Sequence, residues 1–124
     1  MRPIRNHLRS MGLPIEGSKG EAEAGQEELN IKYADALATA DHHTIAKHAI
    51  KEIAYQNGVA ASFLPKLHKD RVGSASHVHK SLWKDGKNAF FYPDRPHAMS
   101  KLMESYVAGM MKYAADYTLS LIHI

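Results

Sequence analysis

Carboxylate side chains concentrate in one glycine-interrupted stretch near the amino terminus. Five glutamates fall within thirteen residues and three glycines separate them: Glu16, Glu21, Glu23, Glu27 and Glu28, with Gly17, Gly20 and Gly25. Mg²⁺ and Mn²⁺ prefer oxygen ligands, and a glycine-bent loop that leads into a strand can direct several carboxylates onto one ion. Composition alone favours a solvated acidic loop instead. Glu28 argues against that alternative because it begins an alternating segment.

A pair of histidines, His77 and His79, forms the second group of residues that could bind a metal or a phosphate. Two imidazoles on one strand face can ligate one ion, or one can bind metal while the other hydrogen-bonds a phosphate. The chain has nine histidines in 124 residues, so this spacing alone does not separate a ligand pair from two exposed, titrating histidines. The preceding residues 73–76 are small, which lets a ligand approach the backbone closely. They are no P-loop, since no Gly-Lys-Ser/Thr ends them.

Residue periodicity predicts the elements that must position these groups. In the first half of the chain we expect helices at residues 1–12 and 39–57 and strands at residues 26–33 and 59–64. Residues 13–25 should form an extended segment and a loop. Asp41 is the predicted N-cap of the longer helix, and Gly58 is its predicted stop.

The second half of the chain predicts a strand, a hairpin and a helix. Residues 76–83 alternate, with His77, His79 and Ser81 on one face. Asp85-Gly86 predicts a tight turn into residues 88–92, and an apolar stripe predicts a helix over 97–117. The expected class is α+β, with antiparallel strands lining a site and two amphipathic helices packed outside.

Composition excludes several classes of protein. The chain is 44% hydrophobic and 23% charged, which suits one globular domain, and its formal net charge of +3 is too small to imply nucleic-acid binding by itself. It has no cysteine, hence no disulfide and no thiolate metal site. No apolar run approaches the roughly 20 residues that span a bilayer, and no secretory signal follows Met1. We therefore expect a soluble, cytoplasmic protein that binds neither membrane nor nucleic acid.

Both groups lie in segments that resemble the glutamine synthetase family. Glu21-Ala-Glu-Ala-Gly-Gln-Glu-Glu28 resembles its Glu-x-x-Pro-Gly-Gln-x-Glu element, and Gly73-Ser-Ala-Ser-His-Val-His-Lys-Ser-Leu-Trp83 resembles its Gly-Ser-Gly-x-His-x-His-x-Ser-Leu element. The resemblance covers residues 12–119, in the family's order and spacing. It is closest to the bacterial branch that includes γ-glutamyl-amide, amine and polyamine ligases.

The resemblance implies an ATP-dependent ligase that joins ammonia or an amine to the γ-carboxylate of glutamate through a γ-glutamyl phosphate. Two or three divalent ions, Mg²⁺ or Mn²⁺, neutralise the developing charge in such enzymes. By position, the resemblance implies that Glu21, Glu28 and His77 are metal ligands. It implies that His79 and Ser81 contact ATP and that Gly73 contacts the substrate. Ammonia, an alkylamine and a polyamine all stay open as the nucleophile.

The chain also departs from the family pattern. Ala24 stands where proline is usual, and Val72 stands where Asn or Asp often precedes the glycine, so we expect a substrate contact to be lost or altered. Glu23 and Glu27 flank the implied ligands, and only the motif register favours Glu21 and Glu28 over them. The rival hypothesis is a non-catalytic module that keeps the fold and binds metal or nucleotide.

Family members are several times longer and form sites between subunits of a double ring. The resemblance therefore implies that residues 1–118 are part of a catalytic domain from a homo-oligomer, and that this part alone is inactive. Residues 119–124 resemble a translated sequencing adapter, so we expect them to be non-native and His123 to bind nothing.

Overall fold

The computed structural model describes residues 1–121, which divide into two compact units. The first unit, residues 1–74, holds α1 (Arg2–Ser10), β1 (Ile15–Gly20), β2 (Glu27–Ile31) and α2 (Ala36–Gln56). The second unit begins at Ala75 and holds β3 (Trp83–Lys84), β4 (Lys87–Asn88), a 3₁₀ turn (Pro96–Ala98), α3 (Lys101–Lys112) and α4 (Ala114–Leu121). Short antiparallel strands with separate helices confirm the predicted α+β class.

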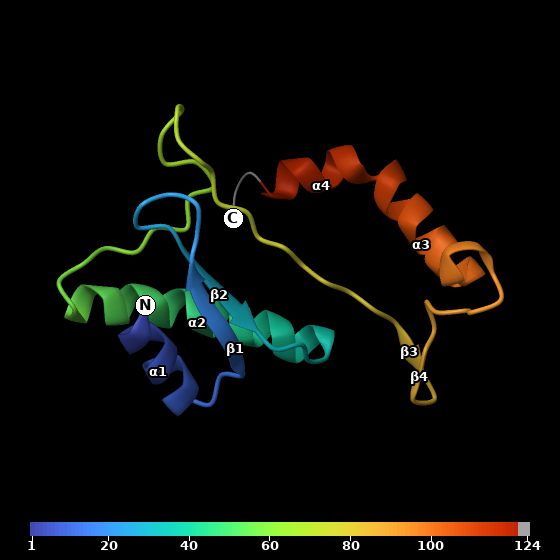
Figure 1. The fold of residues 1–124 in the computed structure, drawn as a ribbon, viewed down its shortest axis with the longest axis horizontal. Helices are drawn as coiled ribbons and strands as arrows, with labels where there is room; N and C mark the ends of the chain where they lie inside the picture. The colour runs from blue at the N-terminus through green and yellow to red at the C-terminus, as the bar shows by residue number, and fades with distance from the viewer. Residues whose placement is uncertain (122–124) are drawn as a thin grey trace. The chain divides into compact units, whose positions relative to one another are not determined.

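The first unit is an antiparallel hairpin packed against two helices (Figure 1). Its core consists of buried apolar residues from α1, the start of β1 and α2: Leu8, Leu13, Ile15, Ala46, Ala49 and Ile53. Leu29 and Ile31 of β2 pack against this core. Because side chains alternate along a strand, Glu28 and Asn30 point to the opposite face. The hairpin therefore presents a polar face away from its helices.

Helix α2 begins earlier than its predicted N-cap. The Asp35 carboxylate accepts a hydrogen bond from Ala38 N at 2.9 Å, so Asp35 is the N-cap and Asp41 lies inside the helix. The prediction of Asp41 was wrong because residues 36–40 are mostly good helix formers that extend the helix back to the first available cap. The predicted stop is confirmed, since Gly58 takes φ 71° just after the helix.

Two predicted strands do not form. Residues 59–64 and 75–82 have no regular secondary structure, although both were predicted to be strand almost throughout. The extended course of residues 75–82 can be followed in Figure 1. A strand requires a hydrogen-bonded neighbour, and within residues 1–121 the only ladders are β1–β2 and β3–β4. The alternation of apolar and polar residues indicates only a local preference for extended backbone. It does not show that a neighbouring strand is present to form the hydrogen bonds.

The predicted turn at Asp85-Gly86 is confirmed, with φ of 50° and 72° at its two central residues, as a tight hairpin turn requires. The strand after it is shorter than predicted: β4 ends at Asn88, and Phe91 makes an isolated bridge to Met99.

The single helix predicted over residues 97–117 is divided. A 3₁₀ turn precedes α3, and Tyr113 separates α3 from α4. Ser100 caps α3 by accepting a hydrogen bond from Met103 N at 3.1 Å, which explains why the helix begins at Lys101. His123 and the last residues of the predicted adapter tail lie outside the described residues. No helix within residues 1–121 is long and apolar enough to cross a membrane.

Candidate functional site

The β1–β2 hairpin brings two of the predicted metal ligands together. Lys19 lies directly opposite Glu28 in the ladder, and Glu21 follows two residues later on the same face. The Lys19 ammonium Nζ is 3.2 Å from Glu21 Oε1 and 3.3 Å from Glu28 Oε2. A carboxylate just after β1 and one within β2 therefore converge on one cationic group.

The pKa values of Glu28 and Lys19 are shifted within this cluster. A hydrogen bond with the Glu21 carboxyl lowers the pKa of Glu28, and contacts with Asn30 and the Lys19 ammonium lower it further. Hydrogen bonds to Glu21 and then Glu28 raise the pKa of Lys19. Glu28 is thus held in the deprotonated form that metal coordination requires.

Glu21 and Glu28 supply part of the ligand set that a hard divalent cation requires. The Lys19 ammonium already lies between two carboxylate oxygens, where Mg²⁺ or Mn²⁺ would find the ligands it prefers. No group of three or more His, Asp or Glu side chains that could hold a metal occurs within residues 1–121. The structure therefore brings together Glu21 and Glu28, while the role of His77, in the second unit, stays a prediction.

The predicted substrate glycine, Gly73, lies in a tightly packed loop. A Cβ at this position would lie 2.8 Å from the backbone oxygen of Pro65, which also accepts a hydrogen bond from Ser74 N at 2.8 Å. Because the obstructing atom is backbone, only glycine fits here without displacing the loop. Residues 72–74 are called the glycine loop below.

The glycine loop is bonded to the acidic turn, residues 21–26, which connects β1 to β2. Gln26 Nε2 donates to Gly73 O at 3.0 Å and lies 3.2 Å from Ser74 Oγ. Glu23 Oε2 accepts from Val72 N at 3.3 Å. The predicted substrate glycine is thereby fixed beside the turn that carries Glu21, one of the predicted metal ligands.

The sequence pattern predicts no role for Gln26, and it places Glu23 only beside the implied metal ligands. The usable signal was the motif itself, because Gly25-Gln26 matches the family element where the preceding Ala24 does not. Nothing local in the sequence indicates that Gln26 would reach a loop 47 residues away.

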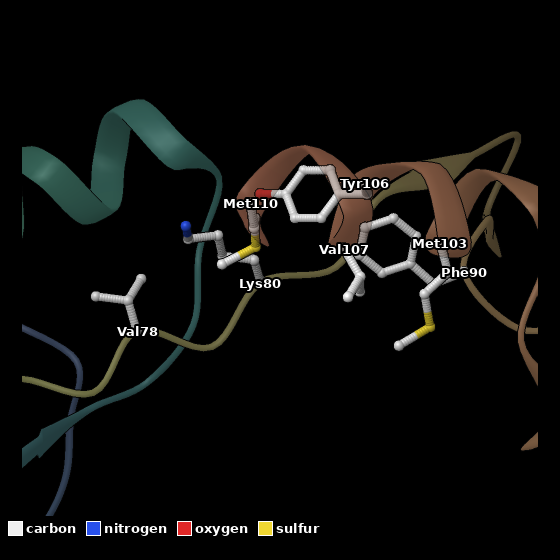
Figure 2. A pocket seen from close by; sticks show the side chains of 7 residues that line it. All are labelled: Val78, Lys80, Phe90, Met103, Tyr106, Val107 and Met110. Atoms are coloured by element: carbon white, nitrogen blue, oxygen red, sulfur yellow. The ribbon is translucent and has the colours of Figure 1, made fainter. Parts of the chain in front are cut away.

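The predicted nucleotide contacts belong to the second unit. His77, His79 and Ser81 are exposed, and Ser81 Oγ accepts a hydrogen bond from Trp83 Nε1 at 2.9 Å. Val78 and Lys80 line a shallow groove with α3 residues, as Figure 2 shows. Phe90 and Tyr106 also line this groove, and their ring centroids lie 5.2 Å apart.

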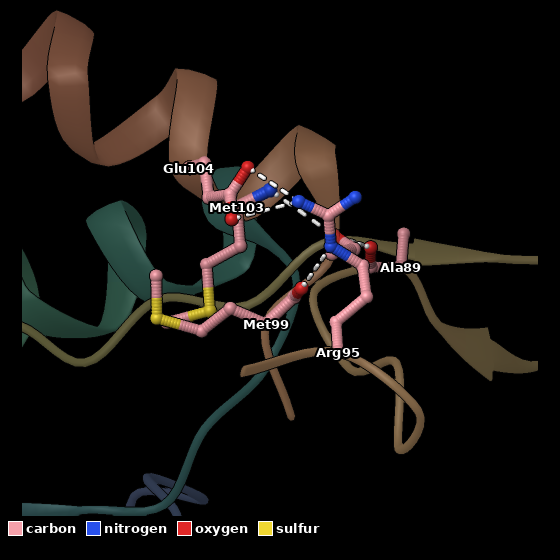
Figure 3. Close-up of polar contacts among 6 residues, drawn as sticks. Ala89, Arg95, Met99, Met103 and Glu104 are labelled. Atoms are coloured by element: carbon pink, nitrogen blue, oxygen red, sulfur yellow. Dashed lines mark hydrogen bonds and ion pairs between the residues drawn. The ribbon is translucent and has the colours of Figure 1, made fainter. Parts of the chain in front are cut away.

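Polar contacts hold the loop before α3 against that helix. Arg95 Nη2 lies 2.9 Å from both carboxylate oxygens of Glu104, and Arg95 Nε donates to Met99 O at 3.1 Å (Figure 3). Ser100 Oγ donates to Ala89 O at 2.7 Å. One guanidinium nitrogen thus bridges both oxygens of Glu104, and these contacts tie the loop to the first turn of α3.

The whole described chain matches one protein family. The model of the glutamine synthetase catalytic domain matches residues 1–122. This chain belongs to the glutamine synthetase family. The predicted family, one of glutamate–amine ligases, is therefore confirmed.

Curated relatives carry two different names within the glutamine synthetase family. The chain is 42% identical over 114 residues to a glutamine synthetase of Thermus thermophilus. The aligned residues make up 92% of this chain and 26% of that relative. It is 38% identical over 117 residues to a glutamate–isopropylamine ligase of a Pseudomonas species, covering 94% of this chain and 26% of that enzyme. The chain thus spans about a quarter of the length of these relatives.

Solved structures of GmaS have the same fold as this glutamine synthetase family member. GmaS without ligand matches with a TM-score of 0.82 at 32% identity, covering 90% of this chain and 26% of that one. GmaS in complex with ADP matches with a TM-score of 0.81 at the same identity. The α+β arrangement is therefore that of part of such an enzyme.

Proposed function

We propose that this chain is part of the catalytic domain of an ATP-dependent ligase that joins ammonia or an amine to the γ-carboxylate of glutamate. The observation that carries the proposal is the convergence of Glu21 and Glu28 on one cation position, inside a segment that matches the family's catalytic domain. The substrates are glutamate, ATP and the nitrogen nucleophile.

The proposed reaction has two steps. A γ-carboxylate oxygen of glutamate attacks the γ-phosphorus of ATP, and the bond to ADP breaks to give γ-glutamyl phosphate and ADP. Ammonia or an amine then attacks the γ-carbonyl carbon, loses a proton, and displaces inorganic phosphate. A bound divalent cation would supply neutralisation of the negative charge that accumulates between nucleotide and carboxylate.

In the proposed site, some residues of this chain would lie beside glutamate and others beside ATP. Glu21 and Glu28 would hold the ion nearer glutamate, and the backbone of Gly73 would face the amino acid. His77 would hold an ion nearer the phosphates, with His79 and Ser81 beside the nucleotide. The hydrogen bonds between the acidic turn and the glycine loop support this, because they join the metal side to the substrate side.

Several properties of the whole enzyme belong to the same proposal. We infer a cytoplasmic homo-oligomer, a double ring with sites between subunits, in which residues 1–118 are native and residues 119–124 are an adapter-derived tail. The coverage of about a quarter of each relative supports a longer parent. Sequencing the source locus tests this, since we expect the reading frame to diverge from the present sequence after residue 118.

Isotope transfer in the full-length enzyme tests the chemistry. Glutamate labelled with ¹⁸O in its γ-carboxylate is incubated with ATP, Mg²⁺ and a panel of ammonia, alkylamines and polyamines. We expect one ¹⁸O atom in the released phosphate and amide formation with only part of the panel, which identifies the nucleophile. Unlabelled phosphate would exclude the acyl phosphate, and a protein that bound Mn²⁺ without ATP turnover would be the non-catalytic module.

A matched pair of variants tests the metal site. Glu28→Gln removes a carboxylate of the converging pair, whereas the neighbouring Glu27→Gln removes an exposed carboxylate that lies outside the Lys19 ion pairs. We expect Glu28→Gln to weaken Mn²⁺ binding at least about tenfold, measured by calorimetry, with Glu27→Gln close to wild type. Equal affinities in the two variants would contradict the assignment.

A further inference from the structure

We propose that Gln26 is a positioning residue that couples the acidic turn to the glycine loop, so that the metal side of the site sets the orientation of the Gly73 carbonyl. The inference rests on the proposed function and deepens it. It is carried by the bonds that the Gln26 side chain makes at both ends of its amide, to two segments of the chain.

The orientation of the Gln26 amide is fixed by what surrounds it. Its Oε1 accepts from Glu23 N at 3.3 Å, and its Nε2 donates to Gly73 O at 3.0 Å. Rotating the amide by half a turn would place Oε1 against the Gly73 oxygen and Nε2 against a backbone N–H, which replaces both bonds by repulsion. Gln26 is also half-buried, so water replaces these bonds only in part.

The backbone ties Gln26 to the metal side of the site. Glu21 N donates to Gln26 O at 2.9 Å, and Gln26 N donates to Glu23 O at 3.0 Å, which closes the acidic turn. Glu28 follows Gln26 by two residues in β2. Movement of either carboxylate toward a bound cation is therefore transmitted to Gln26 through short, hydrogen-bonded backbone.

The glycine loop is held on its other side as well. Ser74 N donates to Pro65 O, and Val72 N donates to Glu23 Oε2. Gly73 O is thus clamped between a backbone anchor and the acidic turn. A carbonyl oxygen has two lone pairs, so the bond from Gln26 leaves one acceptor position for a donor such as the ammonium group of an amino acid.

Gln26→Glu and Gln26→Met test the coupling in the full-length enzyme. Gln26→Glu keeps an acceptor for Glu23 N but opposes a carboxylate oxygen to Gly73 O, and Gln26→Met removes both bonds at similar length without adding charge. Gln56→Glu and Gln56→Met are matched controls, because Gln56 is exposed at the end of α2. Two variants at Gln26 keep the test informative when one of them does not fold.

Two measurements distinguish positioning from a merely structural role. We expect both Gln26 variants to raise KM for glutamate about tenfold with KM for ATP within about twofold of wild type, the scale of one lost hydrogen bond. In hydrogen–deuterium exchange we expect Mg²⁺ to protect residues 72–74 in wild type and in the Gln56 controls, and to protect them less in the Gln26 variants.

The outcomes separate this inference from the proposed function. Variants at Gln26 that match the Gln56 controls in both glutamate KM and Mg²⁺-dependent protection would overturn the coupling, even in an active enzyme. A general loss of turnover with both KM values unchanged would also overturn it. An enzyme that transfers no ¹⁸O to phosphate but still shows Gln26-dependent protection by Mg²⁺ would overturn the proposed chemistry and leave the coupling intact.

Discussion

At the residue scale, Lys19 links the two carboxylates of the acidic cluster. Its ammonium group contacts both Glu21 and Glu28, and it lies on the strand face where the two carboxylates converge. Such a cation neutralises the repulsion between two close carboxylates. In the metal site that we propose, Lys19 would compete with a divalent cation for the same oxygens.

We therefore expect Lys19→Met to increase the affinity for Mn²⁺. The substitution removes a competing charge while the long apolar stem is kept, and the effect should be roughly two- to fivefold because exposed ion pairs are weak. Calorimetric titration of the full-length enzyme measures it, with Lys32→Met as the matched control on the exposed surface. An unchanged or weaker affinity in Lys19→Met would show that Lys19 does not compete for the site.

At the scale of elements, the start of α2 shows how a cap decides where a helix begins. Asp35 has extended backbone angles and accepts from Ala38 N, whereas Asp41 lies a turn and a half further on, inside the helix. Both residues have the right chemistry, so composition alone does not choose between them. Only the residue at the first unpaired N–H groups gains the bond.

Asp35→Ala should lower the free energy of unfolding by about 1 kcal/mol, the usual loss when a cap is removed. Asp41→Ala is the paired control and should change it by less than about 0.5 kcal/mol, as expected for an exposed helix position. Urea unfolding of the full chain gives both values. A larger loss in Asp41→Ala than in Asp35→Ala would place the functional cap at Asp41.

At the scale of the whole molecule, apolar burial is uneven between the two units. The first unit has a cluster of six buried apolar residues, whereas Phe90 is the one buried hydrophobic residue that the structure describes in the second unit. Many large apolar side chains in the second unit are exposed, among them Val78, Trp83 and Leu102. Burial of apolar surface is the main favourable term in folding, so the first unit is the more stable part.

Amide exchange of the full chain, followed by mass spectrometry, checks this expectation. We expect peptides from α2 to exchange more slowly than peptides from α3, because opening α2 exposes the buried cluster and opening α3 exposes little that is fully buried. Both helices have N-caps with side-chain hydrogen bonds, so capping does not account for the difference. Equal protection in the two helices would contradict the assignment of stability to the first core.

The sequence by itself determined the family and the features that depend on a few neighbouring residues. The motifs at 21–28 and 73–83 were sufficient to identify a glutamine synthetase family member, and the stop at Gly58 and the turn at Asp85-Gly86 were correctly predicted. Glycine geometry and alternation act within a few residues, so they can be recognised in the linear sequence.

Only the tertiary structure decided which segments find partners. It left residues 59–64 and 75–82 without a ladder, although both have strand-like sequences, because a strand exists only where another strand offers its N–H and C=O groups. It also placed Lys19 between Glu21 and Glu28, and joined Gln26 to Gly73. These contacts depend on groups from separate strands and loops meeting in space, a condition that residue type and spacing do not encode.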